Sequence, residues 1–418
     1  MISLFLHLAL FLELVSSLNI PTQNNERGPA LLNLVAAPHN VPVSKVRRQG
    51  SQLQSRGLHR RHESNSTLIR PTNSNLQYAV EVKFNGVPRY LLLDTGSSDT
   101  WMFAEDFQCK NANGTSVPQS QCKIGQPYTG EGLDIIKGET FSIIYGNNEN
   151  PTGPMGYADV SVAGLTVEGQ QVALVDNGYW QGDGVLSGVF GIGDRGLTSA
   201  YTPGSDLPHE YTPIFESLYN TTRQVNPLFS LALQRGEAGG YLALGGLPPV
   251  DFKPDFVTTK MLGIPYGTEG GTRAFYSIEA PGYTLNGKTH NESFFAIVDS
   301  GTFVNRFPTD AADKINAAFN PPAIYIPSAD FYVTSCNATV PSFGISIGDK
   351  TFQINPTDMW LVDEPTGLCA TSITRGFPLS KDSYPDGLYV LGDVFLHNVV
   401  VVFDVGNKQM HFAPHTKY

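Results

Sequence analysis

The chain of 418 residues is long enough for one large two-lobed domain or two ordinary domains with a substantial core. Hydrophobic residues make up 41% of it, which excludes an intrinsically disordered chain and a multi-span membrane protein. Only 16% of residues are charged, and 42 Gly and 29 Pro indicate many turns, so the composition favours an extracellular β-protein.

The net charge of −11 is unevenly spread along the chain. Residues 18–70 hold eight Lys/Arg and two Glu, a balance of +6. From residue 71 onward there are 19 Lys/Arg and 35 Asp/Glu, a balance of −16. Because a phosphate backbone requires a basic face, this acidic body argues against nucleic-acid binding.

The first 17 residues are almost wholly apolar and end on small residues. They are too few to span a bilayer comfortably, and Val15 and Ser17 suit the −3 and −1 positions of a secretory cleavage site. We therefore predict a signal peptide over residues 1–17, with an uncleaved anchor as the alternative.

Residues 18–75 show no sustained periodicity and contain two dibasic pairs, Arg47-Arg48 and Arg60-Arg61. Such a segment is either a disordered linker or a basic propeptide that lies on the acidic body and is later removed. The opposite net charges favour a propeptide, whose end stays open between Arg61 and Tyr78. Since acidification protonates carboxylates, we expect falling pH to release it.

Two further features are typical of a secreted protein. Five Asn-x-Ser/Thr sequons supply candidate glycosylation sites: Asn65, Asn113, Asn220, Asn291 and Asn337. The four cysteines form two close pairs, which predicts the disulfide bonds Cys109–Cys122 and Cys336–Cys369 in an oxidising compartment. A zinc site is the competing interpretation, but neither pair has Cys-x-x-Cys spacing or clustered histidines.

From Tyr78 onward, short alternating or β-branched runs are broken by Gly, Asn-Gly and Pro, as in β-strands joined by turns. The clearest predicted strands are Tyr78–Phe84, Phe141–Tyr145, Val160–Val162, Gln171–Val175 and Val399–Phe403. Helical stretches are few, the best being Pro213–Tyr219 and Asp310–Phe319. The pattern predicts a mainly β fold.

The body of the chain contains an internal repeat. Residues 91–97 read LLLDTGS and residues 296–302 read AIVDSGT, so Asp94 and Asp299 occupy the same context 205 positions apart. A second apolar pair ending in glycine follows in each half, at residues 189–191 and 390–392. The repeat implies two lobes of similar fold, each presenting one carboxylate.

These motifs resemble the pepsin-like aspartic proteases from about Tyr78 to Pro414. The resemblance rests on LLLDTGSSDTW (91–101), AIVDSGT (296–302), the Tyr145-Gly146 pair and LGDVFLHNVVVVFD (391–404). It implies a mainly β, bilobal pepsin-like fold with the active-site cleft between two similar β-rich lobes. We predict an N-terminal lobe over 76–245 with the first catalytic aspartate and a C-terminal lobe over 246–418 with the second.

Peptide hydrolysis requires a nucleophilic water and a protonated leaving amine. Two carboxylates that share one proton supply both, because they cannot both ionise cheaply at short range and their pKa values separate. Aspartic proteases are themselves the standard example of this behaviour. By the resemblance, we expect Asp94 and Asp299 to form this pair.

The resemblance also assigns supporting roles. It implies hydrogen bonds from the Ser97 and Thr302 hydroxyls to the outer carboxylate oxygens, bonds across the lobe interface from Thr95 and Ser300, and tight turns at Gly96 and Gly301.

By the same resemblance, Tyr145 and Gly146 would lie on a flap that closes over bound peptide, with the Tyr145 hydroxyl toward Trp101. The alternative for Trp101 and Tyr145 is that they are ordinary core aromatics. The flap tip is unusually polar, and we expect Glu149 near the mouth of the cleft.

The sequence therefore predicts a secreted, fungal-type aspartic endopeptidase, made as a zymogen, that cleaves peptide bonds in proteins at acidic pH. We expect extended peptide substrates, its own propeptide as an intramolecular inhibitor, a monomer, no metal or cofactor, and no stable membrane anchor. An acidic vacuole-like compartment is the second choice of location.

The alternatives to a protease are a catalytically inactive pepsin-fold protein that binds ligands or inhibits enzymes, and a two-carboxylate glycosidase. The retained aspartates and flap tyrosine argue against the first, and the duplicated Asp-Thr/Ser-Gly context against the second.

Overall fold

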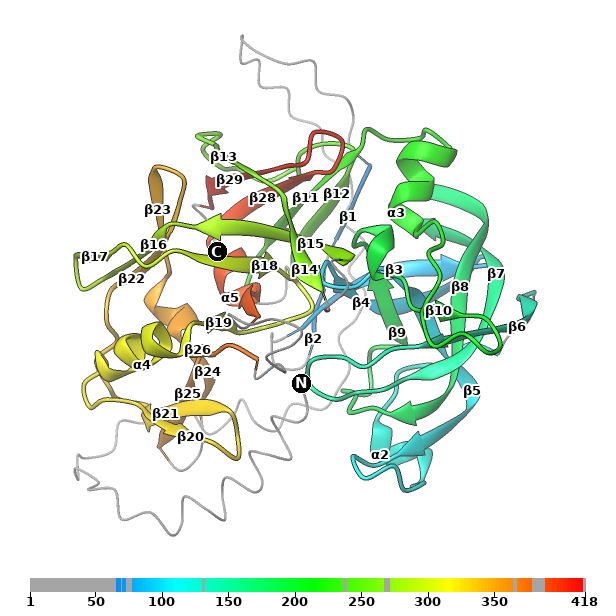
Figure 1. Ribbon diagram of the computed structural model, residues 1–418, viewed down its shortest axis with the longest axis horizontal. Helices are drawn as coiled ribbons and strands as arrows, with labels where there is room; N and C mark the ends of the chain where they lie inside the picture. Colours follow the sequence, from blue (N-terminus) through cyan, green and yellow to red (C-terminus); the bar gives the residue numbers. More distant parts are fainter. Residues whose placement is uncertain are drawn as a thin grey trace, which may run out of the picture.

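The computed structural model describes residues 65–68, 70–72, 77–129, 132–235, 239–266, 271–363, 367–377 and 388–415 (Figure 1). Strands dominate the regular structure, so the predicted mainly β class is confirmed. The predicted signal peptide and residues 18–64 lie outside the described residues. Within the part of the chain that is described, no helix is long and apolar enough to cross a bilayer.

The N-terminal half is built on a nine-stranded sheet. Its strand β3 shows why the sequence forms a sheet, because Val80, Val82 and Phe84 are buried while Glu81 and Lys83 between them are exposed. In spatial order the strands are β10 (Ala200–Tyr201), β6 (Asp134–Ser142), β7 (Thr152–Val162), β8 (Leu165–Tyr179), β5 (Thr100–Lys110), β9 (Gly188–Gly191), β4 (Val87–Asp94), β3 (Gln77–Phe84) and β2 (Arg70–Thr72).

The C-terminal half contains three further sheets. The largest has six strands, in the order β14 (Leu262–Tyr266), β15 (Gly271–Ala280), β18 (Phe294–Val298), β27 (Tyr389–Leu391), β19 (Asn305–Phe307) and β26 (Ile373–Arg375). One four-stranded sheet has the order β17 (Lys288–His290), β16 (Gly282–Leu285), β22 (Phe343–Ile347) and β23 (Lys350–Gln353). The other has the order β20 (Ile324–Ile326), β21 (Phe331–Ser335), β25 (Leu368–Thr371) and β24 (Trp360–Asp363).

A six-stranded sheet with strands from both halves joins them, and its strands lie together in the upper middle part of Figure 1. All six residues of β28 (Val399–Asp404) are buried, which explains why its first five residues are a continuous apolar run and not an alternating one. Across the pairing of β11 with β28, the rings of Phe229 and Phe403 stack with centroids 4.5 Å apart. The order is β1 (Asn65–Leu68), β12 (Gly240–Leu244), β11 (Leu228–Leu233), β28 (Val399–Asp404), β29 (Gln409–Pro414) and β13 (Val257–Lys260).

Strands β1 and β2 lie within residues 18–75, the predicted propeptide. β1 pairs antiparallel with β12 at the edge of the shared sheet, with Ser66 opposite Ala243. β2 pairs antiparallel with β3, with Thr72 opposite Gln77. Both strands are therefore built into the sheets of the body.

Helices are short, as predicted. Within the described ranges they are α2 (Gln119–Cys122), η2 (Arg195–Leu197), α3 (Ile214–Glu216), η3 (Ser217–Thr221), α4 (Thr309–Ala317), η4 (Pro356–Met359) and α5 (Asp393–Leu396). α4 corresponds to the predicted helix at 310–319, and α3 with η3 to the one at 213–219. The predicted strand 141–145 is partly wrong: β6 ends at Ser142, and the Tyr145 N–H closes a turn by donating to the Glu149 carbonyl at 2.9 Å.

Both predicted disulfide bonds are confirmed. Cys109–Cys122 ties the end of β5 to α2, and Cys336–Cys369 ties the residue after β21 to β25. The zinc interpretation is therefore wrong for these cysteines. Glycosylation stays a prediction; the four sequon asparagines whose side chains are described are exposed, namely Asn113, Asn220, Asn291 and Asn337.

Candidate active site

Two equivalent strand pairs deliver the two aspartates. Asp94 ends β4, which runs parallel to β9, and Asp299 directly follows β18, which runs parallel to β27. The partner strands are the apolar pairs that end in glycine. Glycine is required there because a Cβ on Gly392 would come within 2.2 Å of the Thr302 carbonyl oxygen. Each half thus repeats one strand–turn–strand unit.

The two turns hold their carboxylates in matching ways. At Asp94, the Gly96 N–H donates to Oδ1 at 2.8 Å and the Ser97 hydroxyl donates to Oδ2 at 2.5 Å. At Asp299, the Gly301 N–H donates to Oδ1 at 2.8 Å and the Thr302 hydroxyl donates to Oδ2 at 2.6 Å. Both carboxylates are therefore fixed in orientation before any substrate arrives.

The turn glycines bring the two carboxylates together. A Cβ on Gly96 would lie 2.6 Å from Asp299 Oδ1, and a Cβ on Gly301 would lie 2.5 Å from Asp94 Oδ1. Each glycine therefore packs against the carboxylate of the opposite half. Any larger residue at either position would separate the aspartates.

Reciprocal hydrogen bonds also cross between the halves directly beneath the carboxylates. The Thr95 hydroxyl donates to the Val298 carbonyl and the Ser300 hydroxyl to the Leu93 carbonyl, both at 2.9 Å. The Ser300 N–H donates to the Thr95 hydroxyl at 3.0 Å. Both hydroxyl residues are completely buried, so these bonds are shielded from competing water.

The electrostatics favour a proton on this pair. Asp94 is 5% exposed, and its burial, followed by the nearby charge of Asp299, raises its pKa well above the usual range of an aspartate. Two carboxylates at such short range titrate as a unit, so the pair retains one proton into a pH range where isolated aspartates are ionised. The arrangement can therefore donate a proton and accept one in the same site.

A third carboxyl group, which the sequence reasoning missed, lies close to this pair. Asp393 begins α5 and is 2% exposed, and neither of its carboxyl oxygens has a hydrogen-bond partner among the described residues. Burial, together with the charges of Asp299 and Asp94, raises its pKa well above the usual range. The only sequence signal was its place directly after the apolar pair that ends in glycine, at residues 390–392. That position alone does not indicate a functional residue.

The hairpin of β6 and β7 carries Tyr145 at its tip. The indole N–H of Trp101, a fully buried residue, donates to the Tyr145 hydroxyl at 2.8 Å. Burial, followed by the charge of Asp94, raises the Tyr145 pKa well above its usual value, so the phenol stays neutral. The structure thus brings Tyr145 and Trp101 together, and places their contact beside the carboxylate pair.

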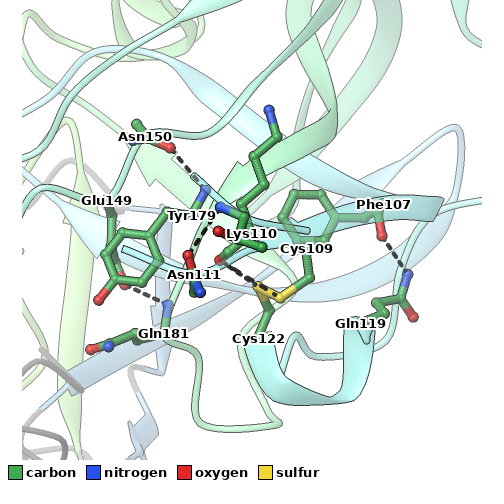
Figure 2. The surroundings of a disulfide bond; sticks show 11 residues. Phe107, Cys109, Lys110, Asn111, Gln119, Cys122, Glu149, Asn150, Tyr179 and Gln181 are labelled. Atoms are coloured by element: carbon green, nitrogen blue, oxygen red, sulfur yellow. Dashed lines mark hydrogen bonds between the residues drawn. A yellow bond between two sulfur atoms is a disulfide. The ribbon is translucent and has the colours of Figure 1, made fainter. Parts of the chain in front are cut away.

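The far side of the hairpin tip is anchored to the chain after β8. Glu149, expected near the mouth of the cleft, is only 6% exposed, and its side chain accepts the Gln181 N–H at 2.9 Å. The Asn150 side chain accepts the Tyr179 N–H at 2.8 Å. Figure 2 shows both bonds beside the Cys109–Cys122 disulfide. Burial raises the pKa of the Glu149 carboxyl group, because its charged form loses the solvation that water would provide.

The tip also touches the C-terminal half. A Cβ on Gly146 would lie 2.8 Å from the tip of the Phe377 ring. The Arg306 guanidinium lies over the Phe377 ring, 3.9 Å from its centroid. Phe377 and Arg306 were not predicted from the sequence, because nothing in their local pattern reports a contact with the other half.

The described residues contain no group of three or more His, Cys, Asp or Glu that could hold a metal ion. The site brings together two carboxylates with their hydroxyl and N–H donors, a third buried carboxyl group, and the Tyr145 hydroxyl at the tip of a hairpin. This is an arrangement for acid–base chemistry on a bound molecule.

The chain is similar to several known proteins. Residues 77–415 match the family model described as eukaryotic aspartyl protease. A probable aspartic-type endopeptidase of Aspergillus fumigatus is 36% identical over 397 residues, which cover 90% of this chain and 87% of that protein. Penicillopepsin-1 of Penicillium janthinellum is 27% identical over 349 residues, which cover 82% and 97% respectively. The crystal structure of an aspartic proteinase from Irpex lacteus has a similar fold, with a TM-score of 0.65 at 18% identity, over 84% of this chain and 98% of that one.

Proposed function

Because this chain belongs to the eukaryotic aspartyl protease family and is an aspartic-type endopeptidase, we propose that Asp94 and Asp299 are its catalytic pair. One observation carries the assignment. The glycine of each turn packs against the carboxylate of the other half, so the two acids share one buried site. Thr95, Ser97, Ser300 and Thr302 are proposed to fix the orientation of the pair through the hydrogen bonds described above.

The pair begins the reaction with one proton between two carboxyl groups. The ionised aspartate accepts a proton from a water molecule as the water oxygen bonds to the peptide carbonyl carbon. The other aspartate gives its proton to the carbonyl oxygen, which produces a neutral tetrahedral diol. One diol hydroxyl then gives its proton to the aspartate that protonated the carbonyl oxygen, as the carbon–nitrogen bond breaks. The amine nitrogen takes the proton that the other aspartate accepted from the water. The products are a carboxylic acid and an amine, and the pair again holds one proton.

The hairpin tip acts as a flap in this proposal. The Tyr145 hydroxyl is held by the Trp101 indole at 2.8 Å, which supports a flap that would cover a peptide bound at the carboxylates. Covering the site excludes bulk water and orders the substrate. Gly146 leaves the flap backbone free of a side chain where it meets Phe377 of the C-terminal half.

Secretion and synthesis as a zymogen belong to the same proposal. The apolar first 17 residues and the two disulfide bonds both suit export into an oxidising compartment. The +6 balance of residues 18–70 against the −16 balance of the body supports a propeptide held by charge near neutral pH. The pairing of β1 and β2 with the body supports a propeptide that ends before Asn65, after the dibasic pair Arg60-Arg61.

Substituting each aspartate in the mature enzyme tests the assignment. Asp94→Asn and Asp299→Asn should each lower kcat/KM on an unstructured protein substrate at pH 3–4 by about 10²- to 10⁴-fold or more. Asp106→Asn is the matched control, because Asp106 is exposed on the same half. Equal activity of either dyad variant and the control would disprove the assignment. Activity that a chelator abolishes but a transition-state-mimicking aspartic-protease inhibitor leaves intact would also disprove it.

A further inference from the structure

One contact between the flap and the C-terminal half joins a residue without a side chain to an aromatic ring. A Cβ on Gly146 would lie 2.8 Å from Cζ and 2.9 Å from Cε1 of Phe377. Real Cβ atoms essentially never approach other atoms so closely. With the flap in this position, nothing larger than hydrogen fits between the Gly146 backbone and the ring.

The Phe377 ring is not free to move aside. Its backbone is fixed because the Phe377 N–H donates to the Leu388 carbonyl at 3.2 Å and the Gly376 N–H donates to the Phe307 carbonyl at 2.8 Å. One face of the ring is covered by the Arg306 guanidinium at 3.9 Å from the centroid, a cation–π distance. Rotation of the ring would sacrifice this stacking.

Arg306 is itself held by the structure around it. It is 8% exposed, donates to Asp330 Oδ2 at 2.8 Å, and donates to the Arg375 carbonyl at 3.0 Å. Asp330 is held in turn by the Tyr325 hydroxyl at 2.8 Å. Because the guanidinium already has these bonds, it keeps the ring beneath the flap tip and does not extend into the cleft as a free cation.

We propose that Phe377 determines specificity in this protease by restricting one substrate position to small side chains, with Arg306 as the residue that positions it. The proposal rests on the proposed function of the flap and the carboxylate pair. A peptide that passes under the flap presents one side chain toward the Gly146–Phe377 contact. Glycine fits there with the flap closed and alanine or serine requires only a small outward shift of the flap, whereas leucine or phenylalanine requires the flap to open or the ring to leave Arg306.

A peptide-library digest of Phe377→Ala at pH 3–4 tests the proposal. The variant should accept large apolar residues at one position of the cleavage profile, with kcat/KM for those peptides about 10-fold or more above the parent. Arg306→Lys retains the positive charge but loses the flat stacking group. It should shift the same position in the same direction by a smaller factor, mainly through KM. Phe295→Ala is the control, since Phe295 is 52% exposed on β18.

A double substitution tests the contact itself. Gly146→Ala should lower kcat/KM strongly when Phe377 is present and much less in the Phe377→Ala background. An unchanged profile for Phe377→Ala, or an equal loss for Gly146→Ala in both backgrounds, would overturn the proposal.

Binding separates this proposal from the catalytic assignment. Calorimetric titration of the Asp299→Asn variant with two peptides that differ only by alanine or leucine at the restricted position requires no hydrolysis. The alanine peptide should bind more tightly, and adding Phe377→Ala should remove the preference. If the preference is found while the dyad assignment fails, this proposal stands alone; if both peptides bind equally, it is wrong.

Discussion

The hydroxyl of Thr95 accepts the N–H of Ser300 across the two halves at 3.0 Å, and the Thr95 N–H lies 3.3 Å from the Ser300 hydroxyl in return. Both residues are completely buried beneath the carboxylate pair. This reciprocal link means that the distance between the aspartates depends on hydrogen bonds that the acids themselves do not make.

Removing one hydroxyl of this link should therefore loosen both the fold and the site. We expect Ser300→Ala to lower the free energy of unfolding by about 1–3 kcal/mol, because the Leu93 carbonyl loses its buried donor. Activity should fall as well, since the two turns lose a common anchor. Urea denaturation and kcat/KM measure the two effects. The control Ser116→Ala changes an exposed serine, and an equal effect there would contradict the prediction.

Asp393 should make stability depend on pH in an unusual direction. Its folded pKa is raised above the unfolded value of about 3.9, so the folded state binds the proton more tightly than the unfolded state. The stability that this group contributes is present below about pH 4 and is lost as the pH rises toward the folded pKa. Asn cannot ionise, so Asp393→Asn should become more stable relative to the parent between pH 3 and pH 7. Melting temperatures across this range measure the difference, and a constant offset would contradict the prediction.

The two disulfide bonds should differ in their effect on the flap. Each closes a loop, with sequence separations of 13 and 33, so replacing either pair by serines should lower the free energy of unfolding by about 3 kcal/mol. The Gly182 N–H donates to the Cys122 carbonyl at 2.7 Å, next to the Gln181 N–H that binds the flap residue Glu149. The double variant of Cys109 and Cys122 should therefore also raise KM. The variant of Cys336 and Cys369 is the matched comparison and should leave KM near the parent value.

The mature protein should begin between His62 and Asn65. Cleavage after residue 72 would remove β1 from the shared sheet and β2 from the nine-stranded sheet, and would expose the edges of β12 and β3. Cleavage after Arg61 leaves both strands in place. Amino-terminal sequencing of the mature enzyme measures the start directly. Arg60→Ala with Arg61→Ala should block or displace processing, and an unchanged start in that variant would contradict the prediction.

Local patterns in the sequence were sufficient for much of this protein. The alternation of apolar and charged residues in β3 predicted a strand, because side chains alternate between the faces of a sheet. The Asp-Thr-Gly and Asp-Ser-Gly turns were visible because few residue types allow such a turn, and the close cysteine pairs predicted both disulfide bonds. The mainly β class and the family followed from these features.

Contacts between segments that are separate in the chain decided the rest. Glu149 lies in a polar stretch of sequence that suggests an exposed flap tip. Its carboxyl group is nevertheless buried against the Gln181 N–H, because the tip folds back onto the chain after β8. Asp393 lies near the carboxylate pair only because β27 runs parallel to β18. The contact of Gly146 with Phe377 joins residues far apart in the chain. A sequence pattern records local periodicity and turn chemistry, whereas such contacts depend on how separate sheets meet, so only the tertiary structure could determine them.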